Sequence, residues 1–435
     1  MEDQLTSIKN ANTKSAKWLR RLKKQSWEAE ILVSTVSIFG TFQLFKIVEW
    51  LTNKFIDFLP PEQYMVGYYI VISALMAVSV LVSMFVIHFF LRAYWVGLVG
   101  LNSVFPDYGL EDSAYSKIYT KKILGILPKS EETIQKVDEL CSVIFSVAFC
   151  FLLTYTYVTI LASVYLFLYN MFSEFLPKMV LLIPVVIIAI ILVLQTLMGM
   201  VALLKRFRNH SKIQTFYFHV VKIASLLTFG PLYKYLLQIT MTFGSNYKKK
   251  KAMIGMLLVF FFSGAVLAVV MASNYNVGHL FLEEPIRKDV VYAAYYENQN
   301  ENSNFLLTPE LQLDIIDSKF VKIFIPLFSH ETKNELQTCG EFEADEDMSD
   351  DENKALRRQF YMNCWMSYNQ VFLNGKRITV DFTRHFHPRT DQYGLLGFIQ
   401  SFEIENGKNI LEVQKIAGKE TTSEWVIPFH YFSKE

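Results

Sequence analysis

The segment MVLLIPVVIIAIILVLQTLMGMVALL, residues 179–204, contains no charged side chain. A helix needs about 20 mostly apolar residues to cross the roughly 30 Å hydrocarbon core of a bilayer, so this segment predicts a membrane-spanning helix. Four other runs have the same character, at about 31–51, 65–91, 143–167 and 252–272. The sequence therefore predicts a membrane α-helical bundle of about five transmembrane helices within residues 26–273.

The composition agrees with a membrane protein. Hydrophobic residues make up 52% of the 435 residues and charged residues only 19%, whereas about 25% of an average soluble protein is charged. Lys and Arg outnumber Asp and Glu by 26 to 15 in residues 1–274, and the balance reverses to 16 against 26 in residues 275–435. Such an asymmetry indicates that the two parts face different compartments. No nucleic-acid partner is expected.

Basic residues also set the expected orientation, because short loops rich in Lys and Arg stay in the cytoplasm. The N-terminus 1–25 is basic, and so are the connections 92–137 and 205–251, which we expect to be cytoplasmic. The connections 58–63 and 173–178 are short and nearly neutral. The first apolar run is too long for a cleaved signal peptide, which predicts a signal anchor that stays in the membrane.

This orientation places the C-terminal residues 274–435 outside the cytoplasm. The outer part contains no Asn-x-Ser/Thr sequence; the one in the chain, Asn209-His210-Ser211, falls on the expected cytoplasmic side. Its absence from the outer part favours a bacterial periplasm over a eukaryotic lumen. We therefore expect a multi-pass protein of the bacterial inner (plasma) membrane, with a cytoplasmic N-terminus and a periplasmic C-terminal domain.

Residues 213–245 raise the question of a further span. The segment is apolar but contains ionisable side chains and a helix-disturbing Gly230-Pro231 step. If it crossed the membrane, the cluster Lys248–Lys251 would lie on the outer face, against the positive-inside rule. We favour an amphipathic segment at the inner interface, whose Lys stems reach water. A helix buried in the core of the bundle is the alternative.

The outer domain has the pattern of a mainly-β, sandwich-like fold. Its polar sequence contains short apolar or alternating runs separated by turn residues, at 290–295, 320–327, 370–373, 377–382, 396–404, 410–415 and 425–432. Asn374-Gly375 and Asn406-Gly407 are strong signals for tight turns. Thr308-Pro309-Glu310 has the order of a helix cap, a first helical residue and an acidic first turn, which predicts one short helix.

Two cysteines, Cys339 and Cys364, lie in this domain. In an oxidising compartment they would form a disulfide bond and close a loop of about 25 residues, which stabilises a fold by about 3–4 kcal/mol in the chain-entropy account. They flank the acidic stretch 341–352. That stretch lacks the glycine and ligand spacing of a calcium-binding loop, so we expect a solvated acidic loop.

Only weak candidates for a metal site exist. His385 and His387 alternate, so both rings would point to one face of a strand, near Asp381 or Asp391. A zinc site needs further ligands at recognisable spacing, and none is evident. We therefore expect no metal, and with no phosphate-binding or hydrolase motif in the chain we expect no cofactor and no catalytic residue.

Charged residues within the apolar runs are the remaining candidates for function, because burying them is costly. Lys46 and Glu49 lie three residues apart on the first run and are expected to form an intramembrane charged pair. Glu28, Glu30 and Arg92 are expected at the inner mouth of the bundle. The third to fifth spans carry no carboxylate near their middle, which argues against an ion-coupled carrier or an intramembrane hydrolase.

Two function classes follow. The first is a non-enzymatic envelope protein for binding, sensing or assembly, which presents its β domain to another membrane or periplasmic protein or to a ligand, with oligomerisation possible. The second is a channel or transport subunit, in which Lys46, Glu49 and the Thr and Tyr side chains of the third span line a path. Conductance or flux measured in liposomes would separate the two.

Overall fold

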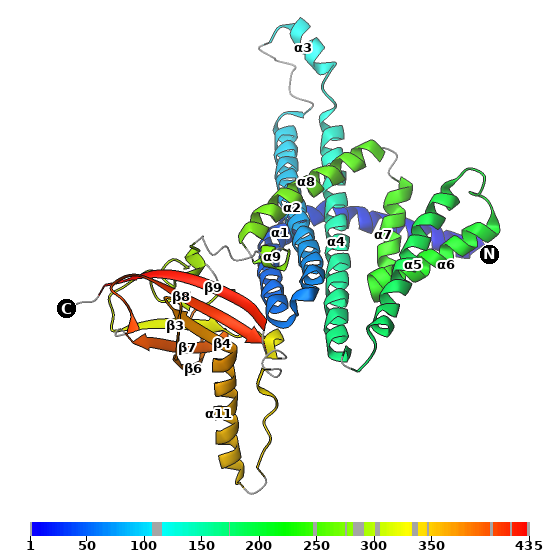
Figure 1. Cartoon of the computed structure of the whole chain (residues 1–435). Helices are drawn as coiled ribbons and strands as arrows, with labels where there is room; N and C mark the ends of the chain where they lie inside the picture. Colours follow the sequence, from blue (N-terminus) through cyan, green and yellow to red (C-terminus); the bar gives the residue numbers. More distant parts are fainter. Residues whose placement is uncertain are drawn as a thin grey trace. The chain divides into compact units, whose positions relative to one another are not determined.

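The computed structural model describes eleven stretches of the chain (Figure 1), at residues 2–106, 115–173, 175–246, 250–274, 276–281, 291–300, 305–332, 338–345, 348–400, 403–417 and 420–432. The chain forms two compact units. The first combines residues 1–49 with 69–274, and is helical. The second combines residues 50–68 with 275–435, and contains the sheets together with the hairpin between the first two long helices.

The helical part is built mainly from long helices, with the bounds α1 Glu2–Phe58, α2 Tyr64–Val104, α3 Lys117–Leu124, α4 Ser130–Phe172, α5 Lys178–Leu203, α6 Ser211–Phe229, α7 Tyr233–Asn246 and α8 Lys250–Asn274. Five segments of the described chain are long and apolar enough to cross a membrane, at Glu30–Phe58, Pro61–Val104, Ser130–Phe172, Lys178–Ala202 and Ser211–Ile239. The described apolar part of α8, Leu258–Ser273, is shorter.

Helix α2 lies at the centre of the packing in the helical part. Its residues Val80, Leu81, Met84 and Phe85 are buried together with Ile144 and Ala148 of α4 and Phe260 of α8. Gly264 of α8 allows a close approach, since an added Cβ would lie 2.7 Å from the Val80 Cα atom. A small residue at such a contact is typical of tightly packed membrane helices.

Helix α5 has the opposite character. None of its most apolar window is buried, compared with 56% for the corresponding window of α2. Its exposed side chains are large and apolar, as at Met179, Ile183 and Ile190. Such a surface is stable only against an apolar surrounding, because exposing it to water is unfavourable by about 25 cal/mol per Å².

The segment 213–245 forms two helices rather than one, α6 and α7, joined by the 3-10 turn Gly230–Leu232. Gly230 ends α6 with a φ of 54°, in the left-handed region that favours glycine. An added Cβ there would also lie 2.5 Å from the ring of Tyr157 on α4. The Gly-Pro step therefore bends the chain where α4 packs against it, and whether the segment crosses a membrane stays a prediction.

The C-terminal part contains two sheets. The first has four antiparallel strands in the order β1-β3-β7-β6, with bounds Glu310–Leu311, Phe320–Pro326, Tyr393–Gln400 and Asp381–Phe386. The second has five strands in the order β2-β9-β8-β4-β5, with bounds Ile315–Ile316, Glu420–Tyr431, Gly407–Ala417, Asn369–Leu373 and Lys376–Ile378. Only β2 and β9 pair in parallel among these strands.

Both sheets contribute to one hydrophobic core. Val321, Ile323 and Ile325 of β3 are buried in the same cluster as Leu411 and Val413 of β8. Buried and partly buried positions alternate along β8 because successive side chains point to opposite faces. Asn374 and Gly375, between β4 and β5, have φ values of 50° and 78°, which confirms the tight turn predicted there.

Three expectations for this part are wrong. Thr308–Glu310 does not start a helix, since Glu310 belongs to β1, and Ala293–Tyr295 is a 3-10 turn rather than a strand. The acidic stretch is not only a loop, because α11 (Asp350–Tyr368) begins within it and leads into β4 (Figure 1). Ser349 and Glu352 form a capping box at its start, and acidic residues in a first turn stabilise the helix dipole.

The structure joins Cys339 to Cys364 through a disulfide bond. The bond fixes the segment before the acidic stretch to the last turns of α11. We expect Cys339→Ser or Cys364→Ser to lower the free energy of unfolding of the sheet region by about 3–4 kcal/mol, because the unfolded chain gains freedom. Pulse proteolysis across a urea series measures this change. Free thiols at both positions, found by mass spectrometry of unreduced protein from cells, would rule the bond out.

Candidate functional site

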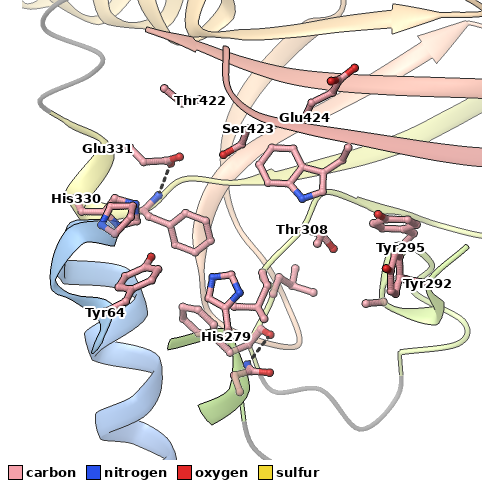
Figure 2. Close-up of a pocket in the computed structure, with 18 of the residues that line it drawn as sticks. Tyr64, His279, Tyr292, Tyr295, Thr308, His330, Glu331, Thr422, Ser423 and Glu424 are labelled. Carbon is pink, nitrogen blue, oxygen red and sulfur yellow. Dashed lines mark hydrogen bonds between the residues drawn. The ribbon is translucent and has the colours of Figure 1, made fainter. Parts of the chain in front are cut away.

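A pocket of about 670 Å³ lies within the second unit (Figure 2). Its wall is formed by the α1–α2 hairpin, the short helix α9 (Val277–Phe281), the turn at Tyr292–Tyr295, the segments 305–308 and 328–331, and strand β9. The volume falls within the range of about 300–1,000 Å³ that is usual for small-molecule sites.

Aromatic side chains dominate the wall. Phe328 and His330 stack with centroids 5.6 Å apart and ring planes 12° apart, and the ring of Tyr64 lies edge-on to His330 at 6.2 Å. Tyr292 and Tyr295 form a second edge-to-face pair at 5.5 Å, on the other side of the pocket from Tyr64 and His330 (Figure 2). Such mutually packed rings give the pocket rigid walls with apolar faces.

Two buried hydrogen-bond donors in the wall have no partner within the described part of the chain. They are Nε1 of Trp425, a residue only 5% exposed, and the hydroxyl of Tyr295, a residue 1% exposed. Burial raises the pKa of Tyr295 above its ordinary value, so the hydroxyl remains protonated at neutral pH. An unsatisfied buried donor destabilises a fold by about 1–3 kcal/mol.

A buried ion pair lies directly behind the wall. Lys415 occupies a core-facing position of β8, and its Nζ atom lies 2.8 and 2.7 Å from the two carboxylate oxygens of Glu331. The same ammonium group donates to the carbonyl of Pro326 at 2.9 Å. It also lies 5.0 Å from the Phe328 ring centroid and 5.6 Å from that of Trp425. The pair therefore holds two aromatic walls in place.

Residues beside Glu331 connect the pocket to the end of α1. The backbone N–H of Ser329 donates to Asp57 Oδ1 at 2.9 Å, and the Ser329 hydroxyl donates to Oδ2 at 3.1 Å. Nδ1 of His330 lies 3.1 Å from the Asp57 carbonyl oxygen. Of these consecutive residues, Ser329 and His330 contact the hairpin. His330 and Glu331 line the pocket, and Glu331 also binds Lys415.

A second polar cluster lies in the helical unit, around Arg92. Its Nη2 atom lies 2.7 Å from Glu30 on α1 and its Nη1 atom 2.6 Å from Asp138 on α4. The guanidinium group also stacks over the Trp95 ring at 4.6 Å, and Arg92 is only 1% exposed. Arg92 and Glu30, both expected at the inner mouth of the bundle, are thus paired in the structure. The side chain of Glu28, the third residue expected there, lies outside the described part.

Asp138 was not among the residues that the sequence pointed to. It lies directly after the connection 92–137, where it resembles any other charged residue before an apolar run. One turn after Glu30 on α1 and one turn before Arg92 on α2, the hydroxyl of Ser34 and Nδ1 of His88 are 2.7 Å apart. The cluster therefore continues into the helical packing as a second polar contact.

The pairing of Lys46 with Glu49 stays a prediction. Lys46 is exposed on α1 and Glu49 is partly buried. Both residues lie at the end of the portion of α1 that belongs to the first unit. Their positions along the helix agree with an approach between the side chains, but the described contacts of the helical part do not define it.

The two histidines considered for a metal site have different surroundings. His385 is exposed on β6, whereas His387 is buried with its Nε2 atom 3.1 Å from Glu310. Burial alone would raise the pKa of Glu310, but the hydrogen bond from His387 and the charge of Arg389 lower it below its ordinary value. Among the described residues no group of three or more His, Cys, Asp or Glu side chains could hold a metal ion.

Comparison with known proteins adds no family, since no family model, no curated protein and no solved structure matches this chain.

Breaking the Lys415–Glu331 pair from one side should destabilise the sheet region strongly. We expect Glu331→Gln or Lys415→Met alone to lower the free energy of unfolding by about 3–5 kcal/mol, because each leaves an uncompensated buried partner. The double variant should be closer to the wild type than either single one. Urea unfolding of the intact, membrane-extracted protein measures all three.

The matched control is the half-exposed pair Lys322–Glu297, whose charged atoms are 2.6 Å apart. Lys322→Met should change the stability by about 1 kcal/mol or less, since a solvated pair contributes little. Equal effects of Lys415→Met and Lys322→Met would show that the buried pair has no special role.

Proposed function

We propose that this chain is a non-enzymatic, multi-pass protein of the bacterial inner membrane that senses a ligand through a periplasmic β-sandwich. The apolar, unburied surface of α5 supports membrane insertion, and the basic connections support the cytoplasmic N-terminus. The shared core of the two sheets supports the sandwich. The lipid bilayer and another membrane or periplasmic protein are the partners, and oligomerisation is compatible with the exposed apolar helices.

One observation carries the sensing role: the segment 328–331 belongs both to the pocket wall and to the contact with Asp57. A ligand in the pocket would touch Phe328, His330 and Glu331, and any shift of these residues would reach Asp57 at the end of α1. A ligand can move an equilibrium only through different contacts in the two states. The aromatic wall and the hairpin contact provide such a difference.

The state of the polar groups favours binding over catalysis. Glu331, the buried carboxylate of the wall, is neutralised by Lys415. The hydroxyl of Thr422 donates to the Lys415 carbonyl at 3.0 Å. Groups that are engaged in this way stabilise the pocket, and they are not poised to activate a nucleophile or transfer a proton.

A channel or transport subunit is the second candidate. The observation that favours it is the cluster of the buried Arg92 with the partly buried Glu30 and Asp138 among apolar helices, because ionisable residues inside a bundle often mark a path for ions or substrates. Two carboxylates around one guanidinium also stabilise the packing of the helices that carry them. Flux or conductance in liposomes that contain the pure protein separates the two candidates.

The membrane topology is tested with a reporter that is active only in the periplasm. We expect activity for a fusion after Glu435 and none for a fusion at Ser245, because the basic connections stay inside. An active fusion at Ser245 would show that the segment containing α6 and α7 crosses the membrane. A silent fusion after Glu435 would place the sheet region in the cytoplasm and contradict the proposal.

The coupling between hairpin and pocket is tested by Asp57→Asn. The Ser329 amide loses a charge-assisted hydrogen bond in this variant, and such bonds are stronger than neutral ones. We expect hydrogen exchange in peptides covering 328–332 to become about tenfold faster or more, since local opening requires less free energy. Exchange mass spectrometry of the intact protein measures this change.

Glu62→Gln is the matched control, because Glu62 is an exposed carboxylate in the same hairpin. It should leave exchange at 328–332 unchanged. If Asp57→Asn also leaves that exchange unchanged, the hairpin and the pocket wall are not coupled through Asp57.

A further inference from the structure

Helix α3 and the turn that follows it are exposed almost throughout. This α3 segment, residues 115–129, lies in the connection between α2 and α4 (Figure 1). Helix α3 has eight residues, and none of them is buried. An isolated helix shorter than about 12–15 residues is only marginally stable in water. Packing against the described part of the chain therefore contributes little to α3, and the segment is suited to binding an external surface.

The exposed side chains of the α3 segment are apolar and basic. Six large apolar side chains are between 41% and 79% exposed, at Tyr115, Ile118, Tyr119, Leu124, Ile126 and Leu127. The segment contains no Asp or Glu and has four exposed lysines, at Lys117, Lys121, Lys122 and Lys129. A complementary surface must offer negative charge together with an apolar layer.

Apolar and basic side chains share one face of α3. Residues three and four apart are neighbours on a helix surface, so Ile118 lies beside Lys121 and Lys122. The ring of Tyr115 lies 5.7 Å from the ring of Tyr119, one turn further along the chain. This mixture is typical of a helix in a membrane interface. Lys stems contact the apolar layer there while their ammonium groups reach the headgroups, and Tyr is enriched at the same depth.

A protein partner fits this surface less well. Lysine is depleted at protein interfaces, whereas here lysines alternate with the most exposed apolar residues. A second copy of the chain would bring two sets of four lysines together, and like charges across an interface repel each other. An anionic leaflet supplies the negative charge and the apolar layer in a single surface.

The end of α2 continues the apolar character toward the α3 segment. Residues 93–106 contain no charged side chain, and Leu101, Val104 and Phe105 are exposed. Exposing such side chains to water is unfavourable in proportion to their area. The chain thus approaches the α3 segment through a helix end that itself favours contact with lipid.

From these observations, and resting on the membrane placement proposed above, we propose that the α3 segment binds the surface of a leaflet rich in anionic phospholipids. The four lysines contact the lipid phosphates. Ile118, Ile126 and the two tyrosines enter the layer between the headgroups and the acyl chains. The basic connection that contains the segment is expected in the cytoplasm, and the leaflet on that side is the negatively charged one.

The test is hydrogen exchange mass spectrometry of the full chain in lipid nanodiscs. One set of discs contains phosphatidylcholine alone, and the other contains equal parts of phosphatidylcholine and phosphatidylglycerol. We expect exchange in peptides covering 115–129 to be about tenfold slower or more in the anionic discs, because each Lys near an anionic surface strengthens binding. Salt at about 1 M should remove most of this difference, since it shortens the Debye length to about 3 Å. Equal exchange in the two lipids overturns the proposal.

Two variants test the assigned contacts. The variant Lys117→Gln/Lys121→Gln/Lys122→Gln/Lys129→Gln should exchange at the same rate in both lipids. Ile118→Ser keeps all four charges and should speed exchange in the anionic discs about tenfold, because it removes a buried apolar contact with lipid. Exchange in peptides of α4 should be the same as in the wild type. A lipid difference that survives the loss of the four lysines contradicts the assigned contacts.

The matched control removes four exposed basic side chains outside the α3 segment. It is the variant Lys319→Gln/Lys354→Gln/Arg357→Gln/Arg358→Gln. This variant has the same net charge as the quadruple lysine variant and should keep the full lipid difference at 115–129. If it loses that difference as well, the total charge of the chain and not the α3 segment is responsible, and the proposal is wrong.

Discs that hold one or two copies of the chain test self-association. Slow exchange at 115–129 that appears only with two copies, in either lipid, would assign the surface to a second copy and overturn the proposal. Both faces of a disc carry the same lipids, so the result does not depend on the orientation of the chain. The reporter fusions test that orientation separately, and the failure of one proposal can therefore be told from the failure of the other.

Discussion

The buried contact between Lys415 and Glu331 is the interaction on which the C-terminal part depends. It places a full positive charge at a core-facing position of β8, where Leu411 and Val413 occupy the preceding inward positions. Such a charge is tolerated only because the Glu331 carboxylate and the Pro326 carbonyl surround it. The position of Glu331 then fixes Ser329 and His330, and with them the approach of the α1 end.

The helical part follows a similar rule with a different arrangement. Arg92 is a buried cation held by carboxylates from two other helices. Each of these hydrogen bonds requires a particular distance and direction. The bonds therefore specify the relative rotation of α1, α2 and α4 more tightly than the packing of apolar side chains alone would. Both units therefore combine an apolar core with compensated buried charges that favour a single arrangement.

Local patterns in the sequence predicted the apolar helices, five of the strands, the Asn374-Gly375 turn and the pairing of the two cysteines of the C-terminal part. The polar contacts were not predictable in this way, because Glu331 and Lys415 are 84 residues apart and nothing in either neighbourhood marks the partner. Helix α11 was missed because its acidic first turn resembles a solvated loop. Trp425 and Tyr295 resembled ordinary core residues, and they are distinguished by donors that have no partner within the described part of the chain.

The parallel pairing of β2 with β9 has a consequence for biosynthesis. Strand β9 ends at Tyr431 and supplies Trp425 to the pocket. It also pairs with both β2 and β8. The five-stranded sheet therefore cannot close, and the pocket cannot form, until the residues of β9 have left the ribosome. Asp57 is synthesised 272 residues before its partner Ser329, so the contact of the hairpin with this segment cannot form until those residues have been made.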